Sequence, residues 1–145
     1  KKGKKIKKEN SVKLLIAEEE KFGIKKYETY EEFGKKVSQI RENVIKNLKE
    51  LKKQNKNIIG YGSPAKATTA LNFFGIKDEI DFIVEDNKLK HNKFVPGVKI
   101  KIKDKSNIKN KQNTIIVLAW NFFEEIKKNN KDLSTNFINI KDLED

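Results

Sequence analysis

The chain has 145 residues, which is enough for one compact domain with a hydrophobic core and too few for two. It contains no cysteine and one histidine, so disulfides and thiolate metal sites are excluded and we expect no metal site. No segment approaches the roughly 18 apolar residues of a membrane span, and no signal-peptide pattern is present. We therefore expect a soluble, cytoplasmic protein without a membrane partner, and, since the chain begins at Lys1, a fragment of a longer one.

The net charge of +12 raises the possibility of nucleic-acid binding. Of the 33 basic residues, however, only Arg41 is arginine, so the forked side chains that read bases and clamp phosphates are almost missing. We expect no nucleic-acid partner. Because the positive excess lies mainly before residue 57, we predict a basic N-terminal segment with packing helices at residues 1–55, followed by an α/β domain at residues 56–145.

Two helices are predicted in the N-terminal segment. The first begins after Ser11 and runs to residue 22, with Val12, Leu15 and Ile16 expected to face inward. The second is expected to open on a capping box formed by Thr29 and Glu32. Its apolar side chains recur every three or four residues as far as residue 51, which predicts a helix that packs on a sheet.

Residues 56–75 are the most informative stretch. They read as a buried strand, a turn containing Gly60 and Gly62, and a helix with Ser63 as its N-cap and Pro64 as its first residue. Free N–H groups at a helix start attract anions, and Lys66 lies in the first turn, so the pattern favours a phosphate site. The alternative is that the two glycines only permit a tight turn.

Further apolar runs predict strands at residues 80–84, 98–102, 114–120 and 136–140, with a helix capped by Asn121 and buried through Phe122, Phe123 and Ile126. Strands that alternate with helices are typical of parallel sheets. The predicted fold class is therefore α/β, with a Rossmann-like, doubly wound and mainly parallel sheet preceded by an N-terminal helical segment.

The carboxyl ends of the predicted strands carry polar clusters at residues 60–63, 85–87 and 120–121, which should converge on one edge of the sheet. Gly60, Gly62 and Ala65 fit the dinucleotide pattern G-x-G-x-x-A, and Asp86 follows where an acid would bind a ribose. Lys66 and the lack of residues suited to hydride transfer argue against a nicotinamide enzyme, and a mononucleotide or diphosphate is the alternative.

Three segments then resemble a known family: GYGSPAKATTALNFFGI at residues 60–76, DFIVEDNKLKHNKFVPGVKIKI at 81–102, and IIVLAWNFFEEI at 115–126. They are similar to the C-terminal domain of S-adenosylmethionine-dependent sugar C-methyltransferases, and the resemblance covers residues 11–143. The chain departs from the family's usual pattern at His91, Asn92 and Val98. The residues that the motifs and the resemblance assign to substrate binding are Gly60, Tyr61, Gly62, Ser63, Lys66, Asn72, Asp86, Asn87, Trp120 and Asn121.

The resemblance implies an enzyme of three parts, namely a zinc-binding segment, a central S-adenosylmethionine domain and this domain. A nucleotide-linked, dTDP-type deoxysugar would lie between the last two, and the methyl group would pass to a carbanion beside a carbonyl. The family's catalytic His and Tyr would precede Lys1, so no catalytic residue and no cofactor is assigned here, and the fragment alone should be inactive. A free-standing nucleotide or dinucleotide module and a purely structural docking domain are the alternatives.

Overall fold

The computed structural model describes residues 10–54, 57–109, 111–134 and 136–145, and the basic run at residues 1–8 lies outside them. The chain divides into two units, Lys1–Ser38 and Gln39–Asp145, which are described separately. Among the described residues, every helix is too short or too polar to cross a membrane.

The first unit contains α1 (Asn10–Phe22) and the start of α2 (Tyr27–Gln54). Gly23 ends α1 as expected, with a left-handed φ of 85° and with hydrogen bonds from its N–H to the carbonyls of Glu19 and Glu20. No residue of α1 is buried, so the prediction that Val12, Leu15 and Ile16 face inward is wrong. The reason is that an amphipathic helix buries its apolar face only where another layer covers it.

Helix α2 begins two residues before the predicted capping box. Thr29 lies inside the helix and donates its hydroxyl hydrogen to the carbonyl of Gly23 at 2.9 Å, so it ties the helix to the preceding turn and the predicted cap is wrong. In the second unit, Val44 and Leu48 of α2 are buried in the core that also contains residues of the sheet. The predicted packing of this helix on the sheet is therefore confirmed for its C-terminal half.

In the described part of the chain, five parallel strands form one sheet in the order β3-β2-β1-β4-β5, with β1 at its centre. The register places Gly60 beside Ile83 on one side and beside Ile116 on the other. This arrangement confirms the predicted Rossmann-like α/β class. The strands are β1 (Ile58–Tyr61), β2 (Phe82–Val84), β3 (Ile102–Lys103), β4 (Thr114–Val117) and β5 (Asn136–Asn139).

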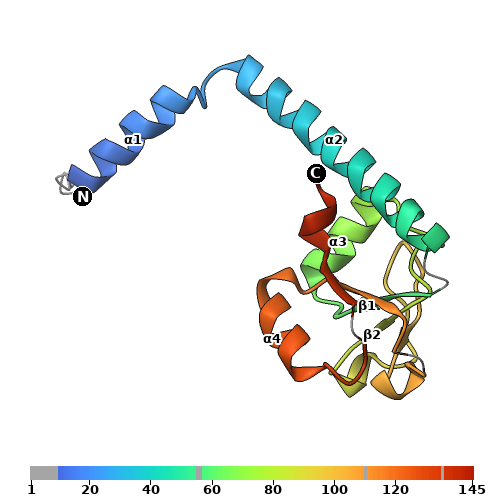
Figure 1. Cartoon of the computed structure of the whole chain (residues 1–145). Helices are drawn as coiled ribbons and strands as arrows, with labels where there is room; N and C mark the ends of the chain where they lie inside the picture. Colours follow the sequence, from blue (N-terminus) through green and yellow to red (C-terminus); the bar gives the residue numbers. More distant parts are fainter. Residues whose placement is uncertain (1–9, 55–56, 110, 135) are drawn as a thin grey trace. The chain divides into compact units, whose positions relative to one another are not determined.

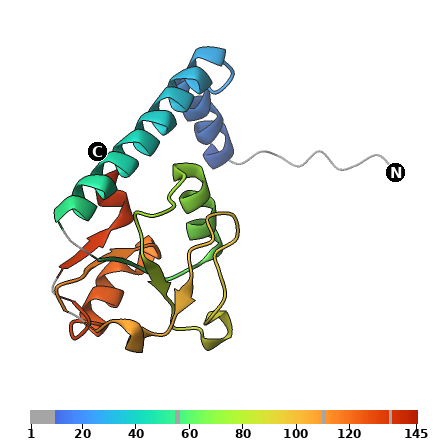
Figure 2. The same ribbon diagram turned by 90° about the vertical axis from the view of Figure 1, so that its right-hand side faces the viewer.

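Helices cover both faces of the sheet (Figures 1 and 2). The C-terminal half of α2 packs on one face with α3 (Ala65–Phe74), and α4 (Phe123–Asn129) packs on the other. Successive residues of β4 point to opposite faces of the sheet. Ile116 therefore packs in the core that contains residues of α2 and α3, and Ile115 packs in the core on the side of α4. All four residues of β4 are buried, as predicted for a strand covered on both sides.

The two predicted side-chain caps in this unit are wrong. The N-cap of α3 is Pro64, which makes no side-chain cap bond. Ser63 does not cap the helix, because it donates its hydroxyl hydrogen to Glu85. A short 3-10 turn, η3 (Trp120–Phe122), precedes α4, so Asn121 does not cap that helix. Phe122 is 58% exposed rather than buried, whereas Phe123 and Ile126 pack on the core as predicted.

The last turn of the chain, η4 (Ile140–Leu143), is held against α2. The side-chain amide of Asn43 donates to the carbonyl of Glu144 at 3.0 Å, and that of Asn47 donates to the carbonyls of Leu143 and Asp145, each at 3.1 Å. Ile140 and Leu143 are buried in the same core as Val44 and Leu48. The end of the chain is thus part of the layer that covers this face of the sheet.

Gly60 is required for packing within the sheet. A Cβ at this position would lie 2.7 Å from Cγ1 of Ile83 and 3.0 Å from Cδ1 of Leu118. Both neighbours are core side chains, with exposed fractions of 0% and 1%, so they have little room to move away. The side chains of Ile83 in β2 and of Leu118, which directly follows β4, therefore leave no room for a side chain at Gly60.

We expect Gly60→Ala to destabilise the fold by about 1–3 kcal/mol, because an added methyl group overpacks the core. Gly34→Ala is the matched control, since Gly34 lies in α2 and a Cβ there meets nothing within 4 Å. The control should gain about 0.5–1 kcal/mol from the better helix propensity of alanine. Urea unfolding followed by circular dichroism measures both, and equal stability of the two variants would contradict the packing role of Gly60.

Candidate functional site

A cavity of about 490 Å³ opens at the carboxyl edge of the sheet. Residues at the ends of β1 and β2 contribute to it, together with Ala119 beyond β4 and one side of α4. The predicted clusters at residues 60–63 and 85–87 therefore meet here, whereas Trp120 and Asn121 do not line the cavity. Its lining consists of Tyr61, Gly62, Pro64, Lys66, Glu85, Asp86, Lys90, Lys105, Ala119, Phe122, Glu125, Ile126, Asn129 and Asn130.

One side of the cavity is a polar network around Tyr61 and Asp86. The Tyr61 hydroxyl donates to Oδ2 of Asp86 at 2.9 Å, and Nζ of Lys105 lies 2.6 Å from Oδ1 of the same carboxylate. Lys105 also donates to Oδ1 of Asn130 at 2.8 Å. Four residues from four different segments are therefore joined, and the Asp86 carboxylate, predicted to bind a ribose, already accepts two bonds within the chain.

In this network, burial and the charge of Lys105 or Asp86 shift the pKa values of Tyr61 and Lys105. Burial is the main cause that raises the pKa of the Tyr61 hydroxyl; Lys105 opposes the rise and Asp86 reinforces it. For Lys105, burial alone would lower the pKa, but the bond to Asp86 raises it above its ordinary value. Tyr61 is consequently held in its neutral form and Lys105 in its charged form at neutral pH.

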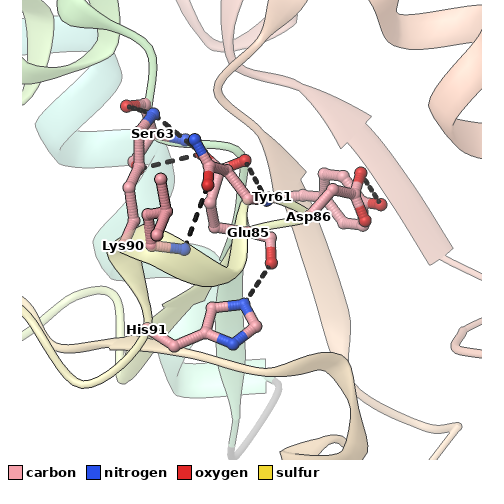
Figure 3. A network of polar contacts seen from close by, with 8 residues as sticks. Tyr61, Ser63, Glu85, Asp86, Lys90 and His91 are labelled. Carbon is pink, nitrogen blue, oxygen red and sulfur yellow. Dashed lines mark hydrogen bonds and ion pairs between the residues drawn. The ribbon is translucent and has the colours of Figure 1, made fainter.

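A second network surrounds Glu85, the residue that directly follows β2 (Figure 3). Its Oε2 atom accepts from the backbone N–H of Ser63 at 2.9 Å, from the Ser63 hydroxyl at 3.0 Å and from Nζ of Lys90 at 3.2 Å. Its Oε1 atom accepts from the N–H of Asn87 at 3.2 Å. Figure 3 shows the Glu85 carboxylate between Ser63 and Lys90, with the Tyr61 and Asp86 pair to one side.

These donors determine the charge of Glu85. Burial alone would raise its pKa, but the hydrogen bonds from Ser63, Asn87 and Lys90 favour the ionised form, and the pKa lies below its ordinary value. Lys90 also donates to the carbonyl of Ser63 at 2.9 Å, and Nε2 of His91 lies 2.7 Å from the carbonyl of Glu85. The carboxylate at this position is thus ionised at neutral pH and fixed from several sides.

Lys66 and Trp120 form a third element of the site. Nζ of Lys66 lies 4.1 Å from the centre of the Trp120 ring, a cation–π contact between the first turn of α3 and the first residue of η3. The tryptophan is half-buried and packs against the core beneath the lysine. Of the three lysines that line the cavity in the described part of the chain, Lys66 alone is without a carboxylate partner.

Other residues predicted for the site lie apart from the cavity. Gly60 is enclosed in the sheet, and Asn87 caps the short turn η1 (Lys88–Lys90) through a bond from the N–H of Leu89. Asn72 donates to the carbonyls of Thr68 and Pro96, so it ties α3 to the loop before β3. Asn121 is exposed within η3.

The packing of Asn72 against this loop accounts for the adjacent residues Pro96 and Gly97. Gly97 has a left-handed φ of 83°, and a Cβ there would collide with the side-chain amide of Asn72. Asn72, Pro96 and Gly97 therefore form one packing unit between a helix and a loop.

The sequence did not predict Lys105 or Asn130 as members of the site, and it placed Glu85 in the polar cluster at residues 85–87 without assigning it to substrate binding. For Glu85 and Lys105 a signal existed, because each lies just after a strand and so at the carboxyl edge of a parallel sheet. Asn130 gave no such signal, since it ends α4 and reaches the site only through the packing of that helix.

The site has the chemistry of a polar binding surface. Three lysines and three carboxylates line it, and Glu85 pairs with Lys90 while Asp86 pairs with Lys105. Among the described residues, no group of three His, Cys, Asp or Glu side chains is placed to hold a metal ion. Gly62 has a left-handed φ of 84°, and a Cβ there would lie 3.0 Å from Cβ of Ala119.

Comparisons with known proteins agree with the resemblance described above. Residues 1–139 match the family described as the C-methyltransferase C-terminal domain. The chain is also 30% identical over 128 residues to the C-methyltransferase NovU of Streptomyces niveus, an alignment that covers 87% of this chain and 30% of that protein. The chain therefore spans less than a third of its relative's length. On the family match, this chain belongs to the C-methyltransferase C-terminal domain family.

Proposed function

We propose that the chain is the C-terminal part of an S-adenosylmethionine-dependent C-methyltransferase, and that its cavity forms one wall of the site for a nucleotide-linked, dTDP-type deoxysugar. The family match and the C-methyltransferase relative support the reaction class. The cavity at the carboxyl edge supports the binding role, since open α/β sheets bind their ligands there.

The observation that carries the proposal is the position of Lys66. Lys66 lines the cavity from the first turn of α3, where the helix dipole also favours negative charge. Lys90 and Lys105 are each neutralised by a neighbouring carboxylate, so Lys66 supplies the charge that a diphosphate would meet. The Trp120 ring holds the lysine without neutralising it.

In this proposal the chain contributes binding, and the rest of the enzyme contributes the methyl donor and the proton transfer. S-adenosylmethionine supplies the methyl group when it is bound to the catalytic domain of the same polypeptide. Within the cavity, Glu85 and Asp86 are engaged in ion pairs, and the raised pKa of Tyr61 keeps its hydroxyl protonated at neutral pH, so it cannot accept a proton there. We therefore expect the 145-residue chain to show no turnover with S-adenosylmethionine and a ketosugar nucleotide.

An NMR titration of the chain with dTDP, a dTDP-sugar, NAD and S-adenosylmethionine tests the ligand class. We expect the amide signal of Lys66 and the indole N–H signal of Trp120 to shift with the two dTDP compounds, because the phosphates approach Lys66. They should not shift with S-adenosylmethionine. Shifts with NAD alone would favour the dinucleotide module instead, and no shift with any of the four would favour the purely structural docking role.

Lys66→Ala should weaken the binding of the dTDP-sugar by about 1–3 kcal/mol, the scale of one lost charge-assisted hydrogen bond. Lys77→Ala is the control, since Lys77 is exposed and lines a separate cavity with Lys52 and Lys99. Isothermal titration calorimetry measures both affinities, and thermal unfolding checks that both variants are folded. Equal affinity of the two variants would remove Lys66 from the site.

A further inference from the structure

The glycine turn after β1 has the sequence of a dinucleotide-binding turn, but a side chain of the chain itself accepts the hydrogen bonds of Ser63 in this turn. In dinucleotide-binding sheets, the pyrophosphate lies against this turn and accepts hydrogen bonds from backbone N–H groups at the helix start. Here the N–H and the hydroxyl of Ser63 both donate to Oε2 of Glu85, at 2.9 and 3.0 Å. A carboxylate of the chain itself thus occupies part of the position that a phosphate would take.

The carboxylate is held firmly in this place. Besides Ser63, it accepts from Nζ of Lys90 and from the N–H of Asn87, and only 14% of its side chain is exposed. Lys90 at the same time donates to the carbonyl of Ser63, so the cation links both partners. For Glu85 to leave the turn, these hydrogen bonds would have to break together (Figure 3).

We propose that Glu85 is a specificity-determining residue that occupies the anion position of the glycine turn and excludes phosphate groups from it. A phosphate brought to this turn would lie next to an ionised carboxylate and would find the Ser63 donors already engaged. Charge repulsion and the loss of donors both oppose its binding. Dinucleotides, which place their pyrophosphate on such a turn, are therefore rejected.

The exclusion also determines where an accepted ligand can place its phosphates. Lys66 lines the same cavity but forms no ion pair with Glu85, so it remains free to meet an anion away from the Ser63 donors. This part of the inference rests on the proposed function, since it assumes a nucleotide-linked ligand. The exclusion of pyrophosphate from the turn does not depend on that assumption.

The variant Glu85→Gln tests the effect of the Glu85 charge separately from the effect of its size. Glutamine has the size of glutamate and keeps one oxygen that can accept from Ser63, but it carries no charge. Glu85→Asp keeps the charge and shortens the side chain. Glu125→Gln is the matched control, because Glu125 lines the same cavity from α4 and its loss removes one negative charge without affecting the Ser63 bonds.

The experiment is an NMR titration of the 145-residue chain and the three variants with inorganic pyrophosphate and with NAD, following the Ser63 amide signal. We expect no saturable shift in the wild type, in Glu85→Asp or in Glu125→Gln. In Glu85→Gln we expect saturable shifts and an affinity for pyrophosphate at least about tenfold higher, because a like-charge contact has been removed.

Two results would overturn the proposal. One is a saturable Ser63 shift with pyrophosphate in the wild type, a measurement that does not depend on the folding of any variant. The other is a gain in Glu85→Gln no larger than that in Glu125→Gln, which would attribute the effect to general charge. Failure of the proposed function is distinguishable, since it would appear as absent binding of the dTDP-sugar while the pyrophosphate results stand.

Discussion

The absence of a side chain at Gly60 is the constraint on which the rest of the site depends, because a Cβ there would lie 2.7 Å from Ile83 and 3.0 Å from Leu118. Without that Cβ, β2 and β4 can pair with β1 in register while Ile83 of β2 and Leu118, which directly follows β4, occupy the space beside Gly60. Glu85 directly follows β2, and Ala119 lies two residues beyond the end of β4. The packing of the sheet therefore brings the carboxylate network and the wall of the cavity to the same turn, with no long loop needed to position them.

The charge of the whole chain and the charge of its site differ. The net charge is +12, yet the cavity has equal numbers of lysines and carboxylates, most of them in pairs. An excess of surface lysine affects solubility and the long-range attraction of anions, whereas selectivity for a ligand depends on which lysine of the cavity lacks a carboxylate partner. Lys66 has an aromatic ring beneath it instead of a carboxylate, so it is the lysine of this cavity whose charge no paired carboxylate neutralises.

The sequence predicted what depends on periodicity and could not predict what depends on distant partners. Apolar runs identified β1 and β4, and their alternation with helices gave the parallel sheet, because burial on both faces leaves a continuous hydrophobic pattern. Ser63 has the residue type and position of a helix cap, but it bonds to Glu85, 22 residues away. Asn130 accepts a hydrogen bond from Lys105, which lies in another element. A local sequence pattern does not indicate which distant partner a polar side chain will bind. Asn72 likewise pairs with Pro96 across 24 residues.

The bonds from Asn43 and Asn47 to the end of the chain span 96 to 101 residues of sequence. Contacts of such long range form late, because the entropy of closing the intervening loop must be overcome first. During synthesis, the buried half of α2 leaves the ribosome well before Ile140 and Leu143, the residues that complete its core. Its apolar stripe would remain uncovered until translation of the chain has passed them, so this helix is the segment for which we expect the greatest dependence on chaperones during folding.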